Sequence, residues 1–129
     1  MFVKITSVFF LLFGSVYGQA LPKLAFGKYL GERESYTILQ NDVEMEIEKH
    51  EISLVISEDA VLYLNGNLEL KGQYEALKQP KGAYLIKANI SNGKSVNYEI
   101  EFTWNKKAKT IFFPGTNGEP DSLLDLVGG

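Results

Sequence analysis

The sequence contains no cysteine, which excludes disulfide bonds, thiol catalysis and cysteine-bound zinc. Histidine occurs once, at His50, so a histidine-based catalytic site has a single candidate and a transition-metal site is disfavoured. The chain also lacks a Gly-x-Ser-x-Gly nucleophile elbow and the two common glycine-rich phosphate-binding patterns. These absences predict a protein that is not an enzyme and that holds no cofactor and no metal.

The chain has no excess of positive charge. Its 13 lysine and arginine residues face 16 aspartate and glutamate residues, which gives a formal net charge of −3. Proteins that bind nucleic acid neutralise phosphates with a basic surface, and anionic lipids attract the same kind of surface. We therefore expect no nucleic-acid partner and no binding to anionic membranes.

The sequence also lacks a long apolar run, and its N-terminal segment contains only a short one. Lys4 precedes an apolar run from Val8 to Phe13, and small residues follow it. This order is typical of a secretory signal peptide, whereas a membrane anchor needs about 20 apolar residues. We interpret residues 1–18 as a signal peptide and residues 19–129 as one exported domain, periplasmic or secreted, without a membrane anchor.

Alternating apolar and polar residues characterise most of the remaining chain. A strand points successive side chains to opposite faces, so each alternating segment predicts one buried and one solvated face. No segment before residue 114 shows an extended helical period. The clearest example is SVNYEIEFTWN, in which one face carries Val96, Tyr98, Ile100, Phe102 and Trp104.

Polar turns separate the alternating segments, and two of them contain the Asn-Gly pair that favours tight hairpins. Such short connections join antiparallel neighbours. We predict an all-β meander of about eight or nine strands, closed into a small barrel, with a β-sandwich as the alternative. The expected strands lie near residues 25–31, 34–40, 43–49, 51–57, 60–65, 67–77, 82–91, 95–104 and 108–113.

The alternation of apolar and polar residues shifts by one position within the stretch DVEMEIEKHEISLVIS. Its apolar positions are odd-numbered in residues 43–47 and even-numbered in residues 52–56. A one-residue shift turns a buried set outward, so the chain must turn here or insert an extra residue. Because EKHE contains no strong turn former, we favour a bulge in one long strand. On either interpretation the solvent face carries Glu44, Glu46 and Glu48, which are too widely spaced along a strand to surround a calcium ion.

Aromatic residues on the apolar faces are the best pointer to a binding site. Tyrosine and tryptophan carry a polar tip that needs a partner when buried, so several inward-facing rings suit a lined cavity. A plainly packed core is the alternative, since about eight strands leave an interior that side chains can fill. The predicted ligand-binding residues are Tyr36, Tyr74, Tyr84, Tyr98, Phe102 and Trp104.

The chain changes character after Phe113. PGTNGEP is turn-forming, and DSLLDLV offers Asp121 as a cap before several leucines. We predict a short C-terminal helix packed on the barrel. A frayed tail and a final edge strand are the alternatives.

Two longer motifs resemble those of a known family. FGKYLGE, with Gly27 and Tyr29, resembles the Gly-x-aromatic opening strand of lipocalins and calycin barrels. EISLVISEDAVLYLNGNLELKGQYEAL resembles that family's strand, acidic turn, strand, Asn-Gly turn and Gly-x-Tyr strand. The chain is thus similar to small lipocalin-like proteins exported by bacteria over most of residues 24–113. The resemblance implies a barrel whose open end admits a small apolar molecule.

Two functions fit these observations. The first is a non-enzymatic exported binding protein that holds a small hydrophobic ligand in the barrel. The second is a barrel with a filled core that acts through its surface, as an envelope interaction protein, an inhibitor or an accessory subunit. The second function predicts an envelope protein partner and an exposed apolar patch, for which the sequence offers Leu62, Leu64 or Leu85.

Overall fold

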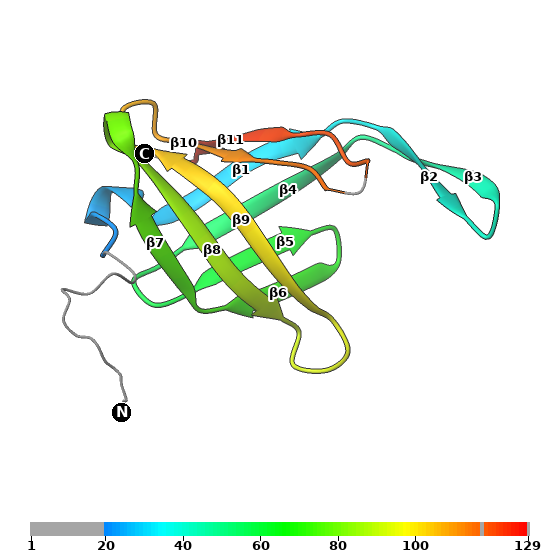
Figure 1. The fold of residues 1–129 in the computed structure, drawn as a ribbon, viewed down its shortest axis with the longest axis horizontal. Coiled ribbons are helices and arrows are strands. Elements are labelled where there is room, and N and C mark those ends of the chain that lie inside the picture. The colour runs from blue at the N-terminus through cyan, green and yellow to red at the C-terminus, as the bar shows by residue number, and fades with distance from the viewer. Residues whose placement is uncertain (1–19, 117, 129) are drawn as a thin grey trace.

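The computed structural model describes residues 20–116 and 118–128, which form a β-barrel with one projecting hairpin (Figure 1). The predicted signal peptide lies outside the described residues. Among the residues described, no helix combines the length and hydrophobicity that crossing a bilayer requires. The barrel strands are β1 (Gly27–Arg33), β4 (His50–Ile56), β5 (Val61–Asn65), β6 (Leu68–Gly72), β8 (Ala83–Ser91), β9 (Asn97–Asn105), β10 (Thr110–Phe113) and β11 (Ser122–Leu126).

The barrel closes on itself through antiparallel pairs. Its strand order is β6-β5-β4-β1-β11-β10-β9-β8, and a pairing of Lys71 with Ser91 joins β8 back to β6. β7 (Tyr74–Lys78) continues the line of β6 and pairs with β8 outside this ring. The predicted antiparallel barrel is confirmed, with eight strands in the ring and one beside it, rather than the sandwich.

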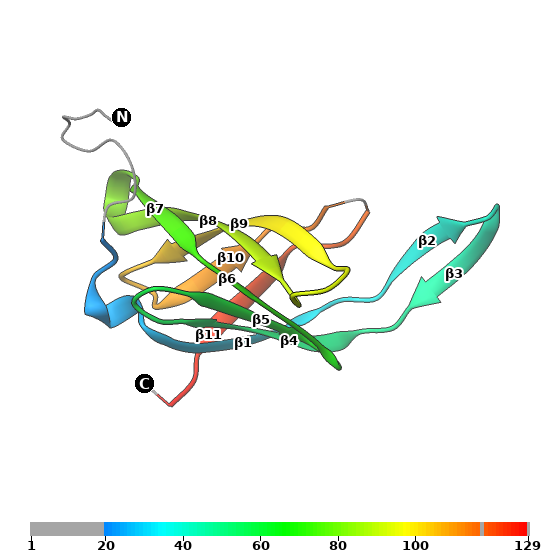
Figure 2. The same ribbon diagram turned by 90° about the horizontal axis from the view of Figure 1, so that it is seen from below.

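The core lies inside the ring of strands. Trp104, Phe102 and Tyr29 are completely buried there with isoleucines and leucines from the neighbouring strands. The 3₁₀ helix η1 (Lys23–Ala25) lies at the end of the molecule opposite the projecting hairpin (Figure 2), and the Tyr29 hydroxyl donates to the carbonyl oxygen of Ala25 at 2.9 Å. Apolar burial of this kind contributes about 1.5–3 kcal/mol for each large side chain.

β1 and β4 continue beyond the barrel as β2 (Tyr36–Gln40) and β3 (Val43–Ile47). The ladder pairs Arg33 with His50 and then Tyr36 with Ile47, so two residues separate these pairs on each strand. Neither strand carries an extra residue, and the predicted bulge is therefore wrong. The two sheets are separated by residues 34–35 and 48–49 but share one register, and the apolar residues of β3 fall on the opposite phase of this register from those of β4.

We call the hairpin from residue 36 to residue 47 the arm. Its apolar side chains were expected to face the barrel interior, and this expectation is wrong, since Val43 is 59% and Met45 42% exposed. The arm extends past the barrel wall and has no sheet beneath it (Figure 1). The prediction that the neighbouring glutamates face solvent is confirmed, because Glu44, Glu46 and Glu48 are all exposed.

The segment after residue 121 forms a strand, so the predicted C-terminal helix is wrong. β11 lies between β1 and β10, pairing Leu124 with Gly31 on one side and with Ile111 on the other. Ser122 and Leu124 are buried, whereas Leu123 and Asp125 are exposed, which is the alternation of a strand. β11 thereby closes the barrel between its first and last parts.

Substitution of Gly72 tests whether the close contact between β6 and β8 contributes to the stability of the barrel. A Cβ atom at this position would lie 1.6 Å from the carbonyl oxygen of Asn89, at the point where β6 meets β8. Gly72→Ala must push the two backbones apart, and we expect it to lower the free energy of unfolding by about 2–3 kcal/mol. Urea unfolding of the purified protein measures this loss.

A second glycine provides the control. Gly66 has a φ of 61°, a backbone conformation that asparagine tolerates, and a Cβ atom at this position would have no neighbour within 4 Å. Gly66→Asn should change stability by less than about 0.5 kcal/mol. Equal effects of the two substitutions would contradict the assignment of Gly72 to the closure.

Candidate functional site

A pocket of about 630 Å³ lies at the open end of the barrel, from which the arm projects. In the part of the chain that the structure describes, β9 pairs with β10 only through residues 103–105, which leaves residues 97–102 without a strand on that side. Pro114, Thr116 and Glu119, between β10 and β11, border the pocket as well. The pocket is lined by Arg33, Tyr63, Asn65, Leu68, Tyr98, Glu99, Ile100, Glu101, Phe113, Pro114, Thr116 and Glu119.

Arg33 is the most unusual of the lining residues, because its charged side chain is only 3% exposed. Position 33 follows Tyr29 and Gly31 on the inward face of β1, so the strand directs Arg33 into the mouth of the barrel. Its Nη1 atom forms an ion pair with Oε1 of Glu119 at 2.7 Å. Its guanidinium carbon lies 5.0 Å from the ring centre of Phe113, a cation–π distance.

The guanidinium of Arg33 is only partly satisfied. Its Nε and Nη2 atoms are buried and have no hydrogen-bond partner among the described residues. An unpaired buried donor costs about 1–3 kcal/mol, so a buried arginine is normally enclosed by acceptors. The mouth of the barrel thus contains two strong donors in need of an acceptor.

Glu119 is positioned by the loop between β10 and β11. The Gly115 amide donates to Oδ1 of Asp121 at 2.9 Å, which draws the two ends of this loop together. A Cβ atom at Gly115 would lie 2.0 Å from the Glu119 carbonyl oxygen, so only glycine permits this approach. The second carboxylate oxygen of Glu119 accepts a long hydrogen bond of 3.4 Å from the Tyr36 hydroxyl.

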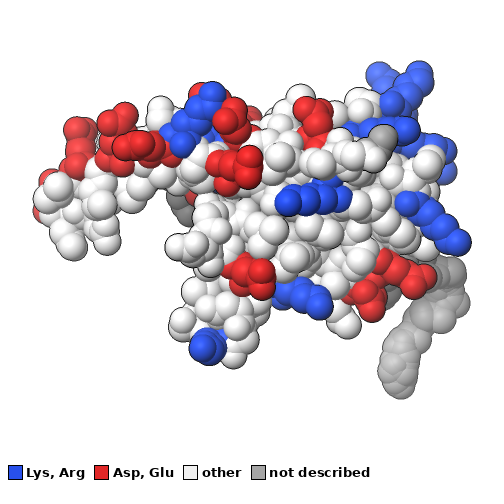
Figure 3. All heavy atoms as spheres, turned by 180° about the vertical axis from the view of Figure 1, so that it is seen from behind, with Lys and Arg blue, Asp and Glu red and all other residues white. Residues whose placement is uncertain are grey.

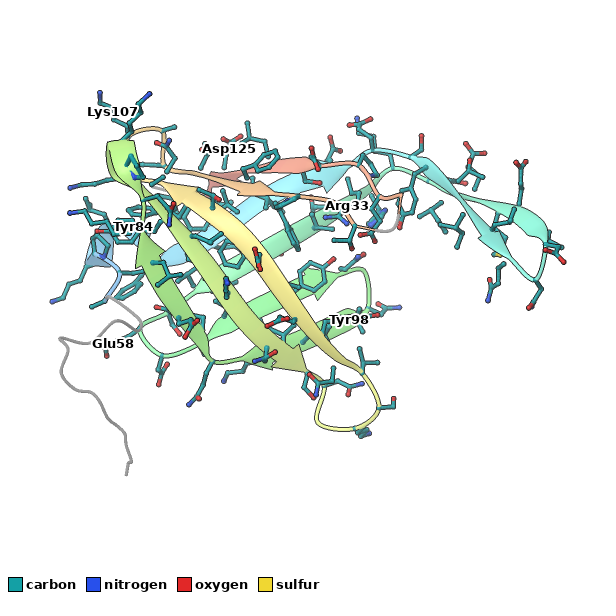
Figure 4. The ribbon with its side chains drawn as sticks, in the orientation of Figure 1. Arg33, Glu58, Tyr84, Tyr98, Lys107 and Asp125 are labelled. Atoms are coloured by element: carbon teal, nitrogen blue, oxygen red, sulfur yellow. The ribbon has the colours of Figure 1, made fainter. Side chains whose placement is uncertain are left out.

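Tyr63 and Tyr98 form aromatic walls of the pocket. The Tyr63 ring meets the Phe113 ring edge to face, with 5.7 Å between their centres, and its hydroxyl accepts a hydrogen bond of 2.9 Å from Asn65. Burial of Tyr63 is the main cause of its raised pKa. Tyr98 lies on β9, on the other side of the mouth from Arg33, and is 51% exposed (Figure 4).

The six residues predicted to bind a ligand do not gather at one place. Of these, Tyr98 lines the pocket, and Tyr36 donates a hydrogen bond to Glu119, which is one of the lining residues. Phe102 and Trp104 are packed in the core, and Tyr84 lies against Trp104, 5.7 Å between ring centres, at the closed end (Figure 4). The Tyr74 hydroxyl donates to the carbonyl oxygen of Ser57 at 2.8 Å.

Sequence reasoning missed Arg33, Tyr63, Phe113 and Glu119. A signal for Arg33 was present, because a charged residue occupies the inward phase of a strand that otherwise carries Gly27, Tyr29 and Gly31 on that face. Glu119 gave no local signal, since it lies in a turn-rich loop where acidic residues are common.

His50 lies outside the pocket, and its Nδ1 atom is 2.9 Å from the carbonyl oxygen of its neighbour Glu48. No group of three histidine, cysteine, aspartate or glutamate side chains suited to a metal ion occurs in residues 20–116 and 118–128. The pocket presents the buried guanidinium of Arg33, aromatic walls, and the polar groups of Asn65, Thr116 and three glutamates.

Comparison with protein-family models, with curated proteins and with solved structures finds no match to this chain. Its similarity to lipocalin-like proteins remains a prediction from short motifs. The functional assignment accordingly depends on the pocket and on the surface of the molecule.

Removing one or the other partner of the ion pair between Arg33 and Glu119 should have unequal effects on stability. Glu119→Ala leaves a buried cation without its partner, so we expect a loss of about 2–3 kcal/mol in the free energy of unfolding. Arg33→Met leaves a carboxylate that is 31% exposed and can be hydrated, and its cost should stay below about 1 kcal/mol. Urea unfolding of both variants gives the comparison.

The double variant is the control for this pair. If the cost of Glu119→Ala comes from the unpaired guanidinium, adding Arg33→Met should recover stability. An Arg33→Met variant as unstable as Glu119→Ala would show that the arginine stabilises the barrel by other contacts.

Proposed function

We propose that this protein is an exported, non-enzymatic binding protein that holds a small, largely apolar molecule in the open end of its barrel. The observation that carries this proposal is the pocket of about 630 Å³ with aromatic walls and a few convergent polar groups. Pockets that enclose small molecules commonly have volumes of about 300–1,000 Å³ and this kind of lining. The predicted signal peptide supports export, and the predicted likeness to lipocalins agrees with a ligand at the barrel mouth.

The packing of the interior limits where such a ligand can lie. Phe102, Trp104 and Ile111 are completely buried in the core, and the Phe102 ring lies 6.2 Å from that of Phe113 in the pocket lining. The ligand therefore lies near the rim, against Tyr98, Ile100 and Leu68, rather than along the barrel axis. A site of this kind, of about 630 Å³, suits a small molecule better than one that extends through the whole barrel.

A neutral fluorescent probe tests the pocket without involving Arg33. N-phenyl-1-naphthylamine brightens in an apolar site, and we expect it to bind the wild-type protein with a micromolar dissociation constant. Ile100→Trp should fill the pocket and weaken probe binding at least tenfold, because the larger ring occupies the same space. Fluorescence titration measures both constants.

The matched control for Ile100→Trp is Asn97→Trp. Asn97 lies on the same strand but on its exposed outer phase and does not line the pocket. Probe binding should survive this substitution. A wild-type protein that neither binds the probe nor carries an extractable molecule when purified from its native host would refute the proposal.

The arm favours a second candidate function, interaction with another protein. Leu39 is 69% exposed, and with Val43 and Met45 it leaves the arm with apolar surface far beyond the barrel. Leu62, Leu64 and Leu85, the expected positions of an apolar patch, are instead partly buried. Exposed apolar side chains thus lie on the arm and also elsewhere, at Leu24, Phe112, Leu123 and Val127, but not at the positions from which we predicted a patch.

Charge indicates the chemistry of a partner for the arm. Carboxylates line the arm, whereas lysines gather at the opposite end of the molecule (Figure 3). At the base, Lys49 pairs with Glu32 at 3.3 Å and with Glu34 at 3.5 Å, and these carboxylates raise the pKa of Lys49. Among the described residues, no lysine or arginine forms an ion pair with Asp42, Glu44, Glu46 or Glu48. A fitting partner would offer an apolar strip bordered by lysine or arginine residues.

Removing the arm tests whether it serves the barrel or a partner. The unbroken register places Ser35 opposite Glu48, so an Asn-Gly turn can replace residues 36–47 and close β1 and β4 as a tight hairpin. We expect the midpoint of thermal unfolding to change by less than about 4 °C, since the arm buries few apolar contacts. Circular dichroism measures this midpoint.

The partner is tested with the same variant. Capture from envelope extracts should recover a stoichiometric basic partner with the full-length protein and lose it with the shortened one. A large fall in thermal stability would instead assign the arm to the fold.

A further inference from the structure

We propose that the ligand of the barrel mouth carries a carboxylate and that Arg33 binds it, which makes the ligand class a small amphipathic carboxylic acid. This inference rests on the proposed binding function and adds the chemistry of its head group. It arises from the two buried nitrogens of Arg33 that have no partner among the described residues, and from the pocket that this side chain borders.

The positions of the unpartnered nitrogens indicate a carboxylate. A guanidinium has two edges on which N–H groups point in parallel, and Nε and Nη2 share one of them. A carboxylate matches such an edge with two parallel hydrogen bonds, which is the geometry that makes arginine pairs with carboxylates specific. Glu119 is bound through Nη1, outside this edge. Arg33 can therefore hold Glu119 and a ligand carboxylate at once.

Both nitrogens are covered by neighbouring atoms, so the edge must turn toward the pocket when a ligand enters. The gain in free energy favours this turn, because two donors that lack acceptors would acquire charged ones. Because the guanidinium is a rigid plane, it would turn as one unit about its Nη1 contact with Glu119 and give up part of its contact with the Phe113 ring. A small rotation of this kind requires no movement of the strand.

Two of the three carboxylates that line the mouth, those of Glu101 and Glu119, are paired with cations. Glu119 is neutralised by Arg33 itself. Glu99 and Glu101 alternate with Tyr98 and Ile100 along β9, so their side chains lie on the outer face and border the pocket through the strand edge. The Glu101 carboxylate lies 3.9 Å from the Lys87 ammonium on that outer face. The carboxylate of a ligand would thus meet the guanidinium inside the wall.

The remaining lining gives the ligand its apolar part. Tyr63, Leu68, Tyr98, Ile100 and Phe113 surround the pocket with ring and aliphatic surface. An acid with a short aliphatic or aromatic body would bury this body against them while its head group reaches Arg33. Apolar burial would supply most of the affinity, and the arginine would supply the selection for an acid.

Three matched probes test the head group: decanoate, decanamide and decanol, titrated into the full exported domain by calorimetry at pH 7. They share one chain, so differences in affinity report the head group. We expect decanoate to bind at least tenfold more tightly than decanamide. With Arg33→Met this preference should fall below about twofold, and measurable binding of decanol to this variant would show that the apolar part of the pocket is intact.

Nuclear magnetic resonance of the wild-type protein gives a second measure that needs no variant. A carboxylate on the Nε and Nη2 edge should move the Nε–Hε resonance of Arg33 strongly downfield with decanoate and little with decanol.

The outcomes separate this inference from the proposed function. Equal binding of decanoate and decanamide, or an unmoved Arg33 resonance at saturation with decanoate, would overturn the carboxylate assignment and leave the apolar pocket standing. Absence of binding by all three probes would overturn both. A preference for decanoate that survives Arg33→Met would place the acid elsewhere and also contradict the inference.

Discussion

The structure depends on one constraint, the unbroken register between the chain segments on either side of the arm. From the pair of Gly27 with Ile56 to the pair of Gln40 with Val43, the ladder neither gains nor loses a residue. Side-chain direction is therefore fixed along its whole length, since alternation has a period of two. The same ladder that sends Tyr29 and Leu54 into the core sends Arg33 into the mouth. Beyond the wall it leaves Ile38 and Met45 on the face opposite to the barrel interior.

The mouth of the barrel is then completed by a contact between distant parts of the chain. β11 lies against β1, so the loop before β11 passes over the end of β1 and brings Glu119 to Arg33. A buried ion pair contributes little net stability compared with apolar packing, yet removing one partner is costly. Its effect here is positional. It holds a guanidinium at the rim with one edge still unpaired, which a packed apolar residue at position 33 could not do.

The fold could be read from the sequence to a large extent, and the site only slightly. Alternation and Asn-Gly turns identified nearly all barrel strands, because both signals are local. The arm was misplaced because a strand in a free hairpin shows the same alternation as a strand in a wall, and only the tertiary structure decides which face is covered. β11 was hidden by the adjacent Leu123 and Leu124, which fit a helix as well as a strand. The partner of Arg33 could not be inferred, since it is brought there by the closure of the barrel.

The carboxylate of Glu119 contacts residues of both candidate functional surfaces, the pocket and the arm. One oxygen of Glu119 pairs with Arg33 in the pocket, and the other accepts from Tyr36 at the base of the arm, where burial and Glu119 raise the tyrosine's pKa. A ligand that rotates the guanidinium of Arg33 would change the electrostatic environment of the Tyr36 hydroxyl. A partner that shifts the arm would alter the second contact of Glu119. Any such coupling is reciprocal, because each site changes the free energy of the other by the same amount. The long Tyr36 hydrogen bond, at 3.4 Å, limits this coupling to a small value and allows the barrel and the arm to act largely as separate surfaces.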